Sequence, residues 1–186
     1  MNYPSPFQSQ RGTSLVEVLV TMVILAIGLL ALAGLQARLH VLQMESYQRA
    51  QALVLLRDMA SRISNNRYVA PNYITATPLG TGALCPTAIA NRQQRDAVEW
   101  CNNIVGASES LGGGNVGSLV GGRGCVEDLG GDEFLVTVAW QGLAPISAPP
   151  ASVTCGQNNY NTAGSACVND LCRRVVTTVV RIPTLT

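Results

Sequence analysis

An unbroken run of eighteen uncharged residues, Val18 to Leu35, lies inside a proline-free stretch from Thr13 to Tyr68. About 20 helical residues are needed to cross the hydrocarbon core of a bilayer, so the run is long enough to cross most of one. Glu17 directly precedes the run. A carboxylate costs roughly 2.5–3.5 kcal/mol at the centre of a spanning helix and less near its end, so Glu17 is a candidate functional group. Its natural partner is a positive charge at the same depth, and cleavage after Gly12 would create one, the free α-amino group of Thr13.

Beyond Leu35 an amphipathic pattern continues without a break and predicts one helix from 14 to about 66. Small and apolar residues recur every three or four positions and indicate a buried stripe: Leu39, Leu42, Ser46, Ala50, Leu53, Leu56, Ala60 and Ile63. Polar residues occupy most of the remaining circumference: Arg38, Gln43, Glu45, Gln48, Arg49, Arg57, Asp58 and Arg62. Asn65, Asn66 and Pro71 provide the stop. Such a helix is about 80 Å long at 1.5 Å per residue, with a first half suited to lipid or a helical bundle and a second half suited to a globular domain.

Residues 68–186 have the composition of that domain. Residues 133–140 predict a strand, because Phe134, Val136, Val138 and Trp140 stand at every second position and fall on one face. Residues 174–182 are rich in β-branched side chains and predict a second, more buried strand. Residues 96–105 are compatible with either a helix or a strand, and residues 111–124 are expected to form a glycine-rich loop. We therefore predict an α+β fold, in which the long N-terminal helix packs on a small antiparallel sheet with disulfide-tied loops.

All six cysteines lie in the last hundred residues: Cys85, Cys101, Cys125, Cys155, Cys167 and Cys172. An even number behind a membrane-directed segment indicates disulfides in an oxidising compartment. Because there is no C-x-x-C pair and the only histidine, His40, lies far upstream, the pattern argues against zinc. Six cysteines allow 15 pairings. Cys85–Cys101 is the least strained in chain topology, but the sequence does not choose between them.

Charge and motif content argue against nucleic acid and against catalysis. Every basic residue is Arg, and loss of residues 1–12 would leave eleven Arg against eleven Asp plus Glu, with no basic stripe. The part of the chain beyond the long helix has no His and no nucleophile-elbow pattern, and its glycine-rich stretches lack the ending of a phosphate-binding loop. We therefore expect no enzyme activity and no cofactor.

Four carboxylates surround the Gly130–Gly131 pair: Glu127, Asp128, Asp132 and Glu133. Hard oxygen ligands of this kind can gather calcium, but the spacing of a calcium-binding loop is missing. We expect a solvated turn before a strand, and no bound metal.

The N-terminal segment has a simpler alternative interpretation as a secretory signal peptide cut at the A-x-A sequence Ala31–Leu32–Ala33. Two features oppose it. Glu17 would place a charge at the start of the apolar core of the signal peptide, and the helical periodicity continues across the proposed cut.

A specific family resemblance covers residues 11–36. The sequence Arg-Gly-Thr-Ser-Leu-Val-Glu at 11–17, followed by the apolar run from Val18 to Leu30, resembles the class III leader and N-terminal helix of type IV prepilins. Within that group, residues 26–36 (Ala-Ile-Gly-Leu-Leu-Ala-Leu-Ala-Gly-Leu-Gln) are most similar to the PilV-like minor pilins.

The resemblance implies three segments: a cleaved leader at 1–12, a long helix at 13–67 with residues 15–35 in the membrane, and a globular head at 68–186. Gly12 would precede the prepilin-peptidase cut, and Thr13 would become the methylated N-terminus. Glu17 would pair with the α-amino group of Thr13 or of a neighbouring subunit. The chain departs from major pilins in having Thr13 where they usually have Phe, and Gly34 where they commonly have a helix-bending Pro.

The resemblance further implies a minor pilin in a tip or priming complex that initiates pilus assembly and supports adhesin presentation, adhesion and twitching motility. Implied partners are other minor pilins, the major pilin, prepilin peptidase, the inner-membrane assembly platform, a large tip adhesin and, before assembly, membrane lipid. The implied location is the bacterial inner membrane, with a cytoplasmic N-terminus and a periplasmic head, and then the pilus. Two alternatives remain: a pseudopilin of type II secretion, and a membrane-tethered periplasmic binding or enzymatic domain.

Overall fold

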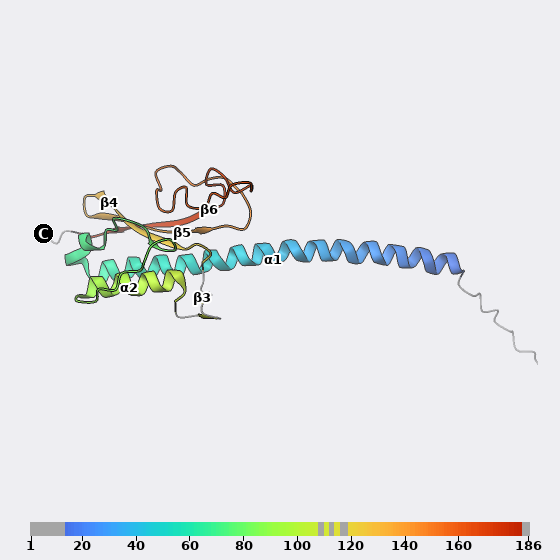
Figure 1. Cartoon of the computed structure of the whole chain (residues 1–186), viewed down its shortest axis with the longest axis horizontal. Helices are drawn as coiled ribbons and strands as arrows, with labels where there is room; N and C mark the ends of the chain where they lie inside the picture. Colours follow the sequence, from blue (N-terminus) through green and yellow to red (C-terminus); the bar gives the residue numbers. More distant parts are fainter. Residues whose placement is uncertain (1–13, 108–109, 112–113, 116–118, 184–186) are drawn as a thin grey trace, which may run out of the picture. The chain divides into compact units, whose positions relative to one another are not determined.

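The computed structural model describes residues 14–107, 110–111, 114–115 and 119–183, and the chain divides into two compact units, residues 1–42 and 43–186. The described part of the first unit is almost entirely helix, because α1 begins at Leu15 and continues into the second unit as far as Asn65 (Figure 1). Every residue from 14 to 42 is exposed. Among the described residues, α1 is the one helix that is long and apolar enough to cross a membrane by length and composition. The single helix predicted over 14 to about 66 is thus observed.

The second unit, residues 43–186, contains the end of α1 and all the remaining elements, and it is named the head of the structure. In chain order these are the 3₁₀ helix η1 (Arg67–Tyr73), β1 (Leu79–Gly80), α2 (Arg92–Val105), β2 (Ser110–Leu111), β3 (Gly114–Asn115), β4 (Arg123–Gly130), β5 (Glu133–Gln141) and β6 (Arg173–Arg181). Four strands form an antiparallel sheet in the order β1-β4-β5-β6, while β2 and β3 pair separately. The α+β, pilin-like fold class is confirmed.

The buried face of α1 differs in part from the predicted stripe. Its buried residues are Gln48, Ala52, Leu55, Leu56, Met59 and Ile63. Of the predicted set, Leu56 and Ile63 are buried, whereas Ser46 and Ala50 are exposed. Gln48, which we assigned to the polar surface, is only 2% exposed. The predicted stripe began at Leu39, before the part of α1 that the head covers. Its repeat averaged fewer than 3.6 residues, so successive positions rotated around the helix away from the face that the sheet covers.

Residues 92–105 form the helix α2, which resolves the alternative left open between helix and strand. Asn91 caps its start by accepting a hydrogen bond from Gln94 N at 2.8 Å, and Gly106 ends it in the left-handed conformation with φ 65°. Trp100 and Ile104 are fully buried, and Trp100 Nε1 donates to the α1 carbonyl of Leu55 at 2.9 Å. The buried side of α2 therefore packs on α1 as well as on the sheet.

The glycine-rich segment expected to be a loop over residues 111–124 contains strand residues, which corrects that prediction. Its described parts include β3 and the start of β4, where Arg123 pairs with Ala139 and Gly124 with Val138. Gly124 is required because an added Cβ would overlap the ring of Trp100. Glycine here allows α2 to approach the sheet closely. A prediction from composition alone assigns such a glycine to a loop.

β5 lies in the interior of the sheet, and β6 lies at its edge. The predicted core face of β5 is buried at Phe134, Val136, Val138 and Trp140. β6 is less buried than β5, since Val179 is 44% exposed, so the prediction of a more buried strand at 174–182 is wrong. Its run of β-branched residues reflects strand propensity and not depth in the core.

Three disulfides tie the head together: Cys85–Cys101, Cys125–Cys155 and Cys167–Cys172. The first attaches the loop before α2 to α2 itself and is the pairing that chain topology favoured. The second attaches β4 to the long connection between β5 and β6, and the third closes a small loop next to β6. Arg173, only 1% exposed, supports the same connection by donating to the carbonyls of Val153 and Cys155 at 2.7 and 3.1 Å.

Candidate functional site

The start of α1 positions Glu17 in the first helical turn. The Ser14 carbonyl accepts hydrogen bonds from Glu17 N at 2.9 Å and Val18 N at 3.2 Å, so Ser14 is the capping residue and Glu17 the third residue of the helix. The spacing Ser-x-x-Glu is that of a capping box, in which the acidic side chain returns to the backbone of the capping residue. The helix dipole also favours a carboxylate at this end. The position of Glu17 thus permits a local role at the helix start, which has to be separated from any role in assembly.

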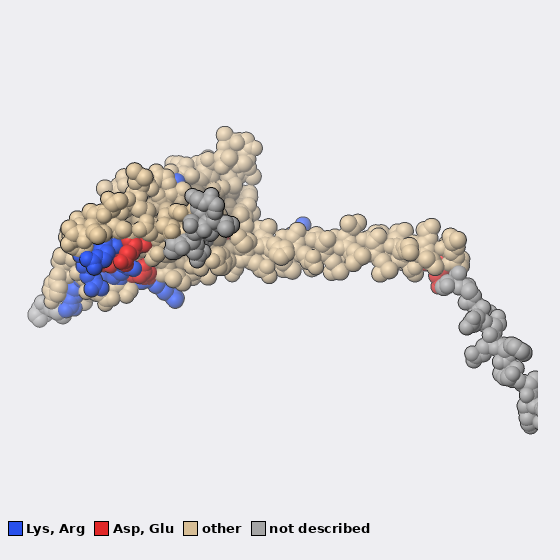
Figure 2. All heavy atoms as spheres, turned by 60° about the horizontal axis from the view of Figure 1, so that its bottom comes forward, with Lys and Arg blue, Asp and Glu red and all other residues tan. Residues whose placement is uncertain are grey.

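Glu17 is exposed, and none of the six ion pairs among the described residues involves it. Gly12 and Thr13 lie outside the described residues, so the cleavage point, the methylated residue and the pairing of Glu17 with an α-amino group stay predictions. The next charged residue along α1 is Arg38. Figure 2 shows the same distribution, with charged side chains concentrated on the head and very few along the apolar half of α1 (Figure 2).

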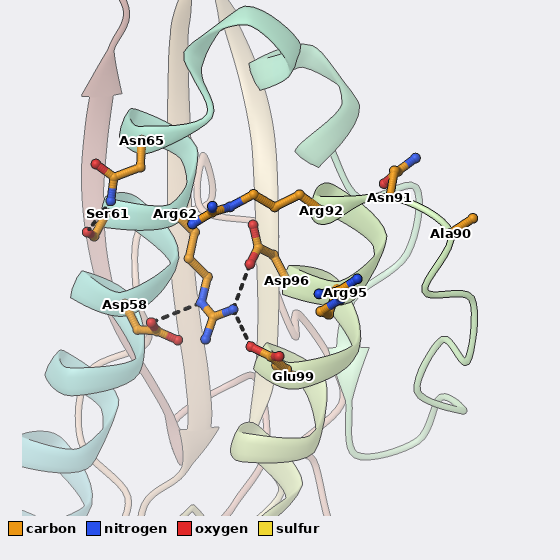
Figure 3. A pocket seen from close by; sticks show the side chains of 10 residues that line it. All are labelled: Asp58, Ser61, Arg62, Asn65, Ala90, Asn91, Arg92, Arg95, Asp96 and Glu99. Carbon is orange, nitrogen blue, oxygen red and sulfur yellow. Dashed lines mark hydrogen bonds and ion pairs between the residues drawn. The ribbon is translucent and has the colours of Figure 1, made fainter.

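A polar hollow of about 590 Å³ lies on the head between the end of α1 and the start of α2. It is lined by Asp58, Ser61, Arg62, Asn65, Ala90, Asn91, Arg92, Arg95, Asp96 and Glu99. Figure 3 shows Arg62 of α1 reaching toward the carboxylates carried by α2 (Figure 3). Its Nε donates to Asp58 at 3.0 Å, and its Nη1 donates to Asp96 at 2.8 Å and to Glu99 at 2.7 Å.

A second layer of hydrogen bonds extends the network to η1. The Tyr73 hydroxyl donates to Asp96 Oδ2 at 2.5 Å and accepts from Asn66 Nδ2 at 3.0 Å. Burial, with the hydrogen bond to Asp96, raises the pKa of Tyr73 from 10.0 to about 12. Burial alone would lower the pKa of Arg62, but its hydrogen bonds with Glu99 and Asp58 raise that pKa above the usual value. The guanidinium of Arg62 therefore stays charged, and its charge is neutralised by the carboxylates of Asp58, Asp96 and Glu99 in the hollow.

Sequence reasoning missed this network. Arg62, Asp58 and Glu99 each look like ordinary surface residues in a linear sequence, and Asp96 and Glu99 are 34 and 37 positions from Arg62. The available signal was the (i, i+4) spacing of Asp58 and Arg62 on a helix. What the arrangement does is attach α2 to α1, because one guanidinium bridges both helices.

The acidic group around the Gly130–Gly131 turn divides between two strands. Glu127 and Asp128 belong to β4, Glu133 begins β5, and Asp132 lies in the turn with φ 61°. Glu127 accepts from the Thr154 hydroxyl, Asp128 Oδ1 accepts from Gly130 N at 2.8 Å, and Glu133 pairs with Arg181 at 2.8 Å. No group of three or more His, Cys, Asp or Glu side chains able to hold a metal occurs among the described residues. Asp128 thus stabilises the turn itself, whereas Glu127 and Glu133 connect the hairpin to the β5–β6 connection and to β6.

Comparison with known proteins identifies one segment. Residues 7–33 match the model described as the prokaryotic N-terminal methylation motif. No curated protein and no solved structure matches the chain. The chain therefore carries a type IV prepilin-like signal.

The matched segment includes Gly12, Thr13 and Glu17, together with most of the exposed apolar run of α1. It ends at residue 33, within the first unit, so it characterises the N-terminal segment only. It is consistent with membrane anchoring and with a structural, pilin-like or pseudopilin-like protein.

Proposed function

We propose that this chain is a minor pilin of a type IV pilus, cut between Gly12 and Thr13, methylated on Thr13, and incorporated into the filament through α1. The observation that carries the proposal is a methylation motif that ends in an exposed apolar helix, with one carboxylate, Glu17, in its first turn. A carboxylate placed there is stabilised by a neighbouring α-amino group in a low-dielectric environment. Other pilin subunits would supply the remaining cover for the apolar surface.

The proposed location is the inner membrane, with the N-terminus in the cytoplasm and the head in the periplasm, followed by the pilus. Three disulfides in the head suit an oxidising periplasm. The proposed role is in a tip or priming complex, with other minor pilins, the major pilin and a large adhesin as partners. Prepilin peptidase and the inner-membrane assembly platform would act on it before incorporation.

Substitution of Glu17 distinguishes a role in filament assembly from a role in capping the start of α1. A capping box accepts Glu or Gln at this position, so Glu17→Gln preserves the helix start while removing the charge. We expect Glu17→Gln to insert normally, to be cleaved, and to be absent from sheared pili, whereas Glu17→Asp retains part of the incorporation. Normal incorporation of Glu17→Gln would show that Glu17 acts only as a cap, and would also favour a membrane-tethered domain over a pilin.

The processing step has a direct readout in this chain. The sequence contains no Lys, so an amine-reactive reagent can label only the α-amino group. Intact-mass measurement should find a chain that begins at Thr13 and is heavier by one methyl group, and its secondary α-amine should take up a single label. A chain beginning elsewhere would overturn the proposal.

A pseudopilin of type II secretion would have the same kind of leader peptide, and a strain that lacks this protein distinguishes a pilin from a pseudopilin. In that strain we expect loss of surface pili with normal release of secreted proteins. Loss of exoprotein release with normal pili would support the pseudopilin instead.

A further inference from the structure

The four-stranded sheet has one closed edge and one open edge. On the closed side, β1 pairs with the start of β4, and Thr75 continues the edge by donating its N–H to the Val126 carbonyl at 2.9 Å and accepting from Val126 N through its hydroxyl at 3.0 Å. On the other side lies β6, nine residues long, whose only strand partner among the described residues is β5.

The register shows which backbone groups of β6 face away from β5. Arg181 lies opposite Glu133, and the next pair is joined by a hydrogen bond from Ile182 N to the Asp132 carbonyl at 3.0 Å. Opposite residues of an antiparallel pair alternate between bonded and non-bonded positions, so the even-numbered residues of β6 bond to β5. The backbone N–H and C=O groups that point outward therefore belong to Val175, Thr177, Val179 and Arg181.

No described residue provides a backbone or side-chain partner for these outward groups. Thr177 is exposed and Val179 is 44% exposed. The Arg181 side chain pairs with Glu133 through Nε at 2.8 Å and is still 77% exposed, so it can accept a second carboxylate. Between Arg174 and Arg181 the strand reads Val-Val-Thr-Thr-Val-Val, without a charge, a glycine or a proline. Proteins normally protect long edge strands with such residues, and an unprotected edge is a template for another strand.

We propose that the β6 edge binds an extended segment of a partner protein as a fifth strand, through main-chain hydrogen bonds. β5 indicates the side chains that fit, because it places Glu133 opposite Arg181, Leu135 opposite Val179 and Ala139 opposite Val175. The occupant is thus an apolar, β-forming segment with a carboxylate opposite Arg181. This surface lies on the head and goes beyond the proposed function, since it depends neither on cleavage nor on α1.

Charge argues against a second copy of this chain as the occupant. Residues 174–181 read the same in both directions, but the mirrored register would place outward-bonding residues opposite inward-bonding ones. A two-fold register centred on Thr177 places Arg181 opposite Arg173 of the other copy, and one centred on Thr178 places it opposite Val175. Neither provides a carboxylate, and opposite cations are destabilising.

The test measures amide exchange of the full chain in detergent micelles, with a synthetic nine-residue peptide of the β5 sequence, Glu-Phe-Leu-Val-Thr-Val-Ala-Trp-Gln, as the probe. Exchange at the amides of Val175, Thr177 and Val179 should be fast in the free chain and slow by about tenfold or more with bound peptide, while even-numbered amides stay protected. A scrambled peptide is the control. Protection of the odd-numbered amides without peptide, absence of slowing at saturating peptide, or dimerisation of the chain through this edge would overturn the proposal.

A matched pair of variants isolates the backbone contribution. Thr177→Pro removes an outward N–H and spares the bonds to β5, whereas Thr177→Val retains the donor. We expect peptide affinity to fall about five- to tenfold for Thr177→Pro, the equivalent of one hydrogen bond, and to be unchanged for Thr177→Val. Arg181→Glu should weaken binding, and a peptide with Arg in place of its Glu should restore it. Equal affinities for the Pro and Val variants would exclude strand addition.

Discussion

At the scale of single residues, Arg62 makes three ion pairs, more than any other cation among the described residues. Its removal would leave Asp96, whose side chain is 8% exposed, without its cation, and an uncompensated buried charge is strongly destabilising. We expect Arg62→Met to lower the free energy of unfolding by about 2 kcal/mol, below the range for fully buried pairs because Arg62 itself is 20% exposed. Asp58→Asn, at a position 33% exposed, is the control and should cost less than about 1 kcal/mol. Denaturant unfolding followed by tryptophan fluorescence measures both, and equal losses would contradict the central role of Arg62.

Tyr73 makes the same network sensitive to alkaline pH. Its pKa is raised from 10.0 to about 12 in the folded head by burial and by Asp96, so the folded state binds the phenolic proton more tightly than the unfolded state. This contribution to stability is complete below pH 10 and is lost as the pH rises toward about 12. We expect Tyr73→Phe to show a smaller loss of stability between these pH values than the parent chain. Some alkaline loss should persist, because burial also raises the pKa of Tyr160. Identical pH profiles for the two chains would refute this assignment.

At the scale of elements, local patterns predicted what local physics determines. The alternation at Phe134–Trp140 predicted β5 and its core face, and the proline-free periodicity predicted the extent of α1. Features that depend on distant contacts were not predictable. Residue 124 of β4 is a glycine because the Trp100 ring lies against it, and Arg62 bridges two helices only when α2 packs on α1. Depth was misjudged at β6 because strand propensity does not encode position within a sheet.

The disulfides permit a prediction at the same scale. In the chain-entropy model a cross-link stabilises by an amount that grows with the loop it closes. Cys125–Cys155 closes a separation of 30 residues and Cys167–Cys172 one of 5. We expect paired Ser substitutions to lower the free energy of unfolding by about 3.5 kcal/mol for the first and about 2 kcal/mol for the second. Equilibrium unfolding of the two double variants provides the comparison, and a larger loss for the short loop would show that local geometry outweighs chain entropy.

At the scale of the whole molecule, the chain combines units that suit different solvents. Residues 14–42 are all exposed, whereas the hydrophobic core of the head, from Ala52 to Val180, lies entirely in the second unit. Sequence periodicity predicted that α1 changes from an apolar helix to an amphipathic one. It did not locate the residue at which the head begins to cover α1, because apolar residues recur on both sides of that boundary.

The boundary between the units predicts that the head folds without the apolar half of α1. A fragment of residues 43–186 retains Glu45, which accepts from Leu143 N at 2.7 Å, as well as the whole core cluster and all three disulfides. We expect this fragment, produced in an oxidising compartment, to remain soluble without detergent and to unfold cooperatively, while the full chain partitions into the detergent phase. A fragment beginning at residue 53 is the matched control. It lacks Gln48 and Ala52, which are 2% and 0% exposed, and should be less stable because it uncovers part of the sheet. Aggregation of the longer fragment under these conditions would mean that the first half of α1 contributes to folding the head, and the two units would then have to be treated as one.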